Sequence, residues 1–167
     1  MAAMIEILRK EHRNIRRLLL ALEHQLEVFA NEQSPDYDVI VGVADYFLDY
    51  PDRCHHPKEE LIVSKLLEAH PEIAAATGDL SREHEALHER ALDFRATVSA
   101  LLNDTDISRS QVVQAGHAFI VAQRRHMQAE EQTLFPLAAR LLKPADWTDI
   151  DRRITKRTDP IFGQPAE

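Results

Sequence analysis

Histidine and glutamate side chains recur in this chain at spacings that suit one face of a helix, and they come from four separate segments. The residues of this set are His12, His55, Glu59, His84, His88, His126 and Glu130. In three of the segments the two residues are four positions apart, so both side chains project from the same helical face. Metal-ligand side chains on four helices can converge only if the helices pack side by side. The pattern therefore predicts a helical bundle.

The apolar pattern of the first segment places its histidine inside. Apolar residues follow one another at steps of three and four across residues 3–31, as in a helix with one core-facing stripe. They are Ile5, Leu8, Ile15, Leu19, Leu22, Leu26 and Phe29. His12 stands four residues after Leu8 and three before Ile15, where the stripe calls for a buried apolar side chain. We therefore expect His12 to point into the core.

Capping and helix-breaking residues divide the rest of the chain into further helices. A second helix is predicted from about residue 36 to 69, kinked or divided by Pro51 and Pro57. Ser81 is the predicted N-cap of a third helix that reaches about residue 102, and Ser108 is that of a fourth that reaches about residue 142. The expected fold is all-α.

Length and composition bound the class of protein. The chain has 167 residues, is 44% hydrophobic and contains only four glycines, which suits one helix-rich globular domain over residues 1–167. Within it we expect the bundle at about 3–142 and a short C-terminal helix and tail at 144–167. A net charge of -8 argues against nucleic-acid binding, which needs a basic face. The single Cys54 excludes an intramolecular disulfide, and we see no signal peptide or membrane span, so we expect a cytoplasmic protein without a membrane partner.

The mixture of ligand types favours a particular kind of metal centre. Imidazole suits iron, zinc, copper and nickel, whereas carboxylates suit harder ions and can bridge two of them. A structural zinc site would use about four ligands and prefer cysteine. Seven ligands are too many for one ordinary ion, so the set favours two iron ions in a non-heme centre. Burying so many titratable groups without a metal would incur a large desolvation cost.

One choice between neighbouring ligand pairs stays open on the residues alone. The segments HHPKEELIVSKL and HMQAEEQTLFPL match when His55 is set on His126. This alignment favours the pair His55 and Glu59. The neighbouring pair, His56 and Glu60, has an acceptable apolar phase as well. His56 and Glu60 are therefore alternates, or they support the ligands.

Two further residues are alternates of the same kind. Glu131 could replace Glu130, because a carboxylate five residues after a histidine can reach a metal if the helix is slightly unwound. Tyr50 lies close enough to the second segment to hydrogen-bond near the centre, although packing is the more frequent use of such a tyrosine.

In combination these motifs resemble the hemerythrin-like proteins, also called HHE cation-binding domains. The resemblance runs from EHRNIRRLL through CHHPKEE and REHEALHE to HMQAEEQTLFPLA, and the terminal DPIFG also looks like bacterial members. It implies an up-down-up-down antiparallel four-helix bundle.

The resemblance also implies a role for each ligand. One iron would be bound by His84, His88 and His126. The other would be bound by His12 and His55. Bridges between the two would be Glu59, Glu130 and an oxo or hydroxo group. The first iron would then be fully coordinated, whereas the second would keep a position open for a diatomic ligand or peroxide.

An open position favours a diiron protein that binds or senses O2, NO or peroxide, or that handles iron in oxidative or nitrosative stress. One alternative is an enzyme, either a diiron peroxidase or catalase-like protein or one that repairs iron centres. Another is a bundle that stores or buffers metal without a redox role. The pattern assigns no catalytic residue. Oxygen carriers of the family have an aspartate one residue beyond the position of Glu130, which argues against simple oxygen transport.

Overall fold

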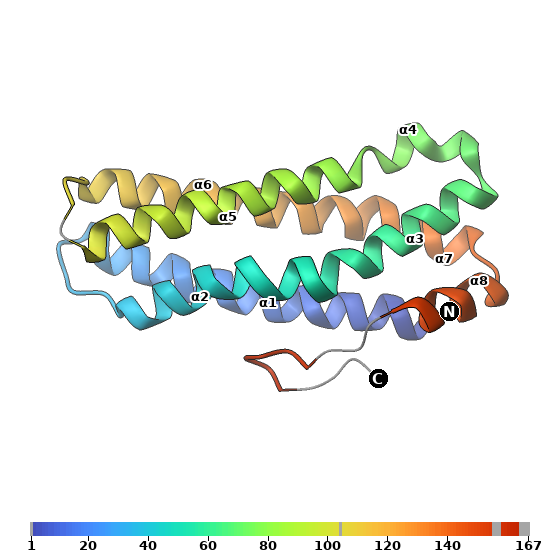
Figure 1. The fold of residues 1–167 in the computed structure, drawn as a ribbon, viewed down its shortest axis with the longest axis horizontal. Helices are drawn as coiled ribbons and strands as arrows, with labels where there is room; N and C mark the ends of the chain where they lie inside the picture. Colours follow the sequence, from blue (N-terminus) through green and yellow to red (C-terminus); the bar gives the residue numbers. More distant parts are fainter. Residues whose placement is uncertain (1, 104, 155–157, 164–167) are drawn as a thin grey trace.

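The computed structural model describes residues 2–103, 105–154 and 158–163, and helices make up most of them (Figure 1). The elements in chain order are α1 (Ala2–Ala30), α2 (Tyr37–Tyr50), the π-helical segment η1 (Pro51–His55), α3 (His56–Ala69), the 3-10 turn η2 (Pro71–Ile73), α4 (Ala74–Thr77), α5 (Leu80–Leu102), α6 (Arg109–Ala129), the π-helical segment η3 (Glu130–Leu134), α7 (Phe135–Leu141) and α8 (Pro144–Arg153). The prediction of an all-α fold is confirmed.

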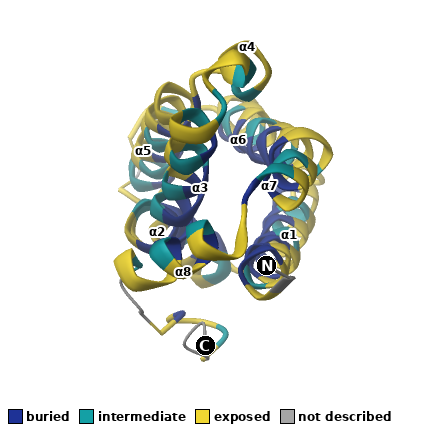
Figure 2. Cartoon of the chain, turned by 90° about the vertical axis from the view of Figure 1, so that its right-hand side faces the viewer, coloured by how far each residue is buried: buried dark blue, intermediate teal, exposed yellow. Residues whose placement is uncertain are grey.

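The long helices pack as a bundle. α1 packs against α2 and α6, and α5 packs against the same two helices from the other side. α3 continues the direction of α2, and α7 continues that of α6 (Figure 1). Seen along the bundle, the helices turn their buried faces toward one another and their exposed faces outward (Figure 2). Side chains at the inner faces therefore meet across all four rows of helix.

The inner face of α1 follows the apolar stripe of its sequence. Leu8, Leu19 and Leu22 are fully buried, and His12 lies on the same stripe with none of its surface exposed. Trp147 of α8 is buried in a cluster with side chains of α1, α3 and α7, so α8 covers that end of the core. Of the predicted C-terminal tail, residues 155–157 and 164–167 lie outside the described residues.

Capping explains where two of the long helices begin. Ser108 caps α6 as predicted, because its hydroxyl accepts a hydrogen bond from the backbone N–H of Gln111. The prediction that Ser81 caps the third helix was wrong. Gly78, at φ 66°, ends α4 in the left-handed region, and the following Asp79 accepts a hydrogen bond from the N–H of Arg82. Asp79 is therefore the N-cap of α5, which begins at Leu80, just before Ser81.

Among the described residues, no helix combines the length and the apolar character that crossing a bilayer requires.

Candidate metal centre

Two overlapping groups of histidine and glutamate side chains lie buried inside the bundle. The first consists of His56, Glu59, His84 and His126. The second consists of His12, His55, Glu59 and Glu130. Within each group the candidate ligand atoms lie within 4.8 Å of one another. Because Glu59 belongs to both groups, the two sites adjoin, and one carboxylate can reach ions in both.

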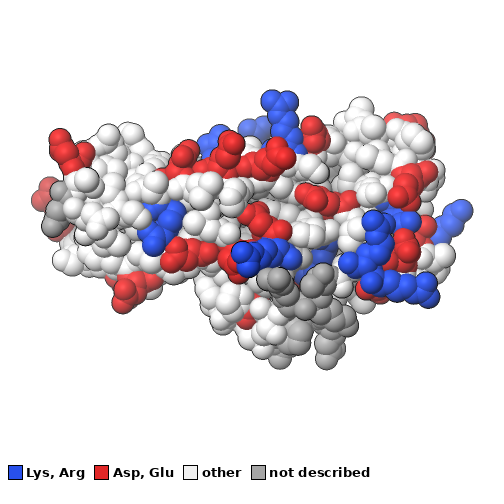
Figure 3. Space-filling model, in the orientation of Figure 1, with Lys and Arg blue, Asp and Glu red and all other residues white. Residues whose placement is uncertain are grey.

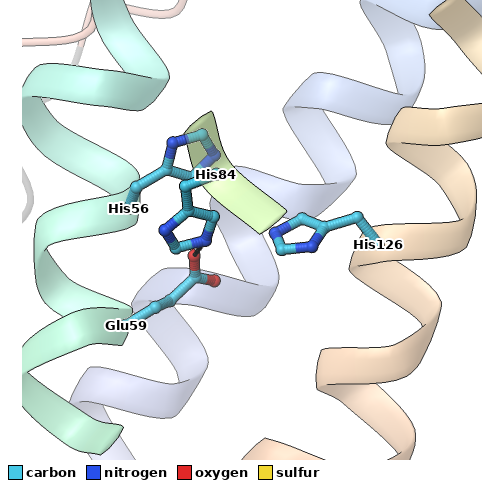
Figure 4. Close-up of side chains that lie close together, drawn as sticks. All are labelled: His56, Glu59, His84 and His126. Carbon is cyan, nitrogen blue, oxygen red and sulfur yellow. Dashed lines mark ion pairs between the residues drawn. The ribbon is translucent and has the colours of Figure 1, made fainter. Parts of the chain in front are cut away.

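The first group draws on three helices (Figure 4). His56 and Glu59 come from α3, His84 from α5 and His126 from α6. The rings of His56 and His84 stack at a centroid distance of 3.9 Å and an angle of 10°. The ring of His126 stands almost perpendicular to that of His84, 5.0 Å away. Three imidazoles therefore surround one point next to Glu59.

The second group joins α1 to η1. The Nε2 atoms of His12 and His55 are 3.1 Å apart. Glu59 Oε1 lies 3.5 Å from the Nε2 of His12 and 3.1 Å from that of His55. Glu130 lies between the groups as well, because its Oε2 is 3.4 Å from His12 Nε2 and its Oε1 is 3.1 Å from His126 Nε2. Both glutamates are thus placed to span two ions.

Each of the five imidazoles has a carboxylate at its outward nitrogen, Nδ1. The pairs and their distances are His12 with Glu131 at 2.9 Å, His55 with Glu11 at 2.8 Å, His56 with Asp52 at 3.1 Å, His84 with Glu60 at 3.1 Å and His126 with Glu83 at 3.3 Å. When the ring is neutral, donating its Nδ1–H to a carboxylate leaves Nε2 unprotonated and fixes its direction, as in metal-bound histidines. This arrangement prepares all five rings as ligands.

Several atoms that face the centre lack any hydrogen-bond partner within the described part of the chain. They are both carboxylate oxygens of Glu59, both of Glu130, and the Nε2 atoms of His84 and His126. Buried polar atoms are nearly always hydrogen-bonded, and leaving a charged one without a partner is costly. A cation at each group would coordinate these atoms. The residues present therefore fit metal binding.

Two π-helical segments occur where consecutive residues both face the centre. His55 ends η1 and His56 begins α3, while Glu130 and Glu131 are the first residues of η3. In η1 the N–H of His56 donates to the carbonyl of Pro51, five residues earlier. Such a turn holds an extra residue, so adjacent side chains diverge less than in an α-helix. The wider turn at η1 lets His55 and His56 reach the two adjoining groups.

The carboxylates reverse the effect of burial on several histidines. Although burial alone would lower it, Glu59 and Glu11 raise the pKa of His55 to about 10. Burial also lowers the pKa of His84, but the carboxylates of Glu130 and Glu59 outweigh it and raise this pKa to about 9. For His56, burial prevails and the pKa is lowered. Without metal, protons on these rings balance the charge of the glutamates, and a binding cation must displace them.

The structure brings together six of the seven residues that the sequence pattern selected. They are His12, His55, Glu59, His84, His126 and Glu130. It does not bring His88, the seventh, to either group. The His88 side chain is 39% exposed, and its Nδ1 is hydrogen-bonded to Asp52. His56, which follows η1 directly, is buried and belongs to the first group.

The other alternates support the ligands. Glu60 and Glu131 hold the outward nitrogens of His84 and His12, and Arg16 in turn donates to Glu131 at 2.7 Å. The hydroxyl of Tyr50 donates to Glu11 at 3.3 Å.

Sequence reasoning missed the carboxylates of Glu11, Asp52 and Glu83. The contact of Asp52 could have been predicted, since Asp52 precedes His56 by four residues and a helix brings such pairs together. Glu11 and Glu83 pair with histidines of other helices, 44 and 43 residues away. No local spacing indicates such partners.

Comparison with known proteins gives one match. A family model described as the hemerythrin HHE cation-binding domain matches residues 3–138. Searches of the curated proteins and of the solved structures found no match.

Proposed function

Because the chain belongs to the hemerythrin HHE cation-binding family, we propose that its buried centre holds two iron ions and binds a small oxidant such as dioxygen, nitric oxide or peroxide. One iron would be held by His56, His84 and His126. The other would be held by His12 and His55. Glu59 and Glu130 would span both ions. When bound, the irons would supply the coordination positions and the electrons that such ligands require.

The observation that carries this proposal is the set of buried candidate ligand atoms that have no hydrogen-bond partner. Glu59 is completely buried and Glu130 is 2% exposed, and neither has a hydrogen bond to its carboxylate oxygens within the described residues. Imidazole with carboxylate suits iron, whereas a closed zinc site favours thiolate. The chain's one cysteine, Cys54, belongs to neither ligand group.

The ligand sets of the two ions are unequal, and this favours binding of an external ligand at one of them. Three imidazoles serve the first ion and two serve the second, so the second has room for one more donor. The ring of His12 stacks on Phe135 at 5.3 Å and 26°, and both residues are buried. A centre enclosed in this way suits a small ligand rather than a large organic substrate.

The test is metal content followed by ligand binding. Protein loaded with Fe²⁺ under anaerobic conditions should contain about two irons per chain by elemental analysis. Oxidation or exposure to nitric oxide or peroxide should change its visible absorption. His12→Ala should hold less iron, whereas His24→Ala, a change at an exposed histidine of the same helix, should behave like the wild type. One iron or none per wild-type chain, or no spectral response to any of the three ligands, would reject the proposal.

A second candidate is a peroxide-consuming enzyme, and one observation favours it. The ring of Tyr50 stacks on that of Tyr46 at 5.4 Å, and Tyr50 reaches the centre through Glu11 and His55. Such phenols could donate electrons to an oxidised centre. Under this candidate, Tyr50→Phe slows peroxide consumption by the iron-loaded protein while Tyr37→Phe does not. Absence of peroxide consumption by the wild type would remove this function and leave ligand binding in place.

A further inference from the structure

A cavity of about 520 Å³ adjoins the metal centre between α3 and α5. Two imidazoles of the centre, those of His56 and His84, form part of its lining. His84 is 5% exposed, and its Nε2 has no hydrogen-bond partner within the described residues. The cavity therefore leads from the protein surface to candidate ligands of the metal centre.

Four other residues of the lining carry carboxylates. They are Asp52, Glu60, Glu85 and Glu89. Glu85 and Glu89 are exposed, and neither forms an ion pair or hydrogen bond through its carboxylate within the part of the chain that the structure describes. Acidic side chains also gather over α5 on the face shown in Figure 3. A cleft lined by one sign of charge raises the local concentration of the opposite ion.

Exposure falls from the mouth of the cavity to its floor. The side chain of Glu60 is 45% exposed, that of His88 39% and that of Asp52 28%, whereas that of His56 is 7% exposed. Asp52 connects His88 to His56, because its Oδ2 accepts a hydrogen bond from His88 and its Oδ1 accepts one from His56. Side chains that can coordinate a cation therefore follow one another from the solvent-exposed mouth to the buried centre.

We propose that this cavity is the route by which divalent metal cations enter the centre. Carboxylates at the mouth attract the hydrated ion, His88 and Asp52 replace part of its water, and the ion then passes to His56 and His84. The proposal rests on metal binding at the centre, as proposed above. It also gives His88 a role in metal loading, although it lies outside both ligand groups.

A second cavity makes a poorer route for a cation. It measures about 180 Å³ and reaches Glu130, but much of its lining consists of Ala75, Ala76, Gly78 and Ala129. Such residues offer a cation no side-chain donor. The charge and the donors both favour the cavity beside His88.

The experiment measures how fast metal-free protein takes up metal. Stopped-flow mixing with Co²⁺ at low ionic strength follows the appearance of the metal-bound absorption. The double variant Glu85→Gln/Glu89→Gln should load at least about fivefold more slowly, and high salt should reduce the difference. Ser81→Phe, which fills the cavity without changing charge, should slow loading at every salt concentration. Final metal content should stay at the wild-type value in both variants.

A matched control removes the same charge elsewhere. Glu6→Gln/Glu27→Gln changes two exposed glutamates of α1, which contributes no residue to the cavity lining. It should load at the wild-type rate. If the Glu85→Gln/Glu89→Gln variant took up metal at the same rate as this control, the proposed entry route would be wrong, whatever that rate is. In that case wild-type protein would still bind its metal, whereas a wild type that binds none would overturn the proposed function together with the route.

Discussion

Replacing His56 or His88 by alanine separates the ligand set of the structure from that of the sequence pattern. His56 is 6% exposed and stacks on His84, so His56→Ala removes one of the three imidazoles that we propose for one ion. His88→Ala removes a hydrogen bond to Asp52, which keeps its bond to His56 at 3.1 Å. We therefore expect only the first variant to lose metal-dependent stability.

The size of that loss follows from linkage between binding and folding. At a free metal concentration about 100 times Kd, one bound ion stabilises the folded chain by about 2.7 kcal/mol. In a chain of this length about 1 kcal/mol shifts Tm by about 3 °C, so each ion raises Tm by about 8 °C. If loss of an imidazole weakens that ion about 100-fold, its stabilisation falls to about 0.4 kcal/mol. The metal-dependent rise in Tm should then be smaller by about 7 °C.

The assay is thermal unfolding of each variant with and without Fe²⁺ under anaerobic conditions, together with metal content. Comparing the two melts of the same variant cancels any loss of packing that is independent of metal. His88→Ala should retain the full metal-dependent rise. If His88→Ala lost one ion per chain while His56→Ala kept both, the assignment of His56 would be refuted and the pair of histidines on α5 restored.

Three further predictions concern protons, supporting carboxylates and packing. The pKa of His84 is raised to about 9, and metal binds only the neutral ring, so apparent metal affinity should rise as pH increases from about 6 to about 9. Protons should be released on binding, which calorimetry in buffers of different ionisation enthalpy would measure. An affinity that fell with rising pH would contradict this prediction. Glu131→Ala removes the acceptor 2.9 Å from His12 Nδ1 and should weaken metal binding about 10- to 100-fold, as measured by competition with a chelator. An unchanged affinity would show that Glu131 does not support the centre. Gly116→Ala would place a methyl group 3.0 Å from Leu26 Cδ2. This overpacking should lower the unfolding free energy of the metal-free protein by about 1–3 kcal/mol. An unchanged melting curve would show that the helices can move apart at this position without cost.

The fold was predictable to the extent that local pattern decides it. The apolar stripe of α1 and the cap at Ser108 are properties of neighbouring residues, and both appear in the structure as expected. The start of α5 was not predicted, because a left-handed glycine and an aspartate can end one helix and begin the next as well as a serine can. The predicted start of this helix therefore failed at a turn whose backbone conformation the pattern does not specify.

The ligand set divides in the same way. Spacing of four residues is a property of a regular helix, and it selected His126 with Glu130 from sequence alone. It fitted His55 with Glu59 and His56 with Glu60 equally, and only the alignment of the two segments favoured the first pair. The same spacing selected His84 with His88, but His88 remains at the mouth of a cavity.

Residue types and periodicity thus determined an all-α chain of a cation-binding family with histidine and glutamate on its inner faces. The tertiary structure decided which of them meet. A π turn at η1 changes the direction of consecutive side chains without changing their spacing in sequence, so it could place His56 in the centre only once the helices were packed. The carboxylates that orient each imidazole likewise come mostly from other helices, and contacts between distant segments depend on packing rather than on local order.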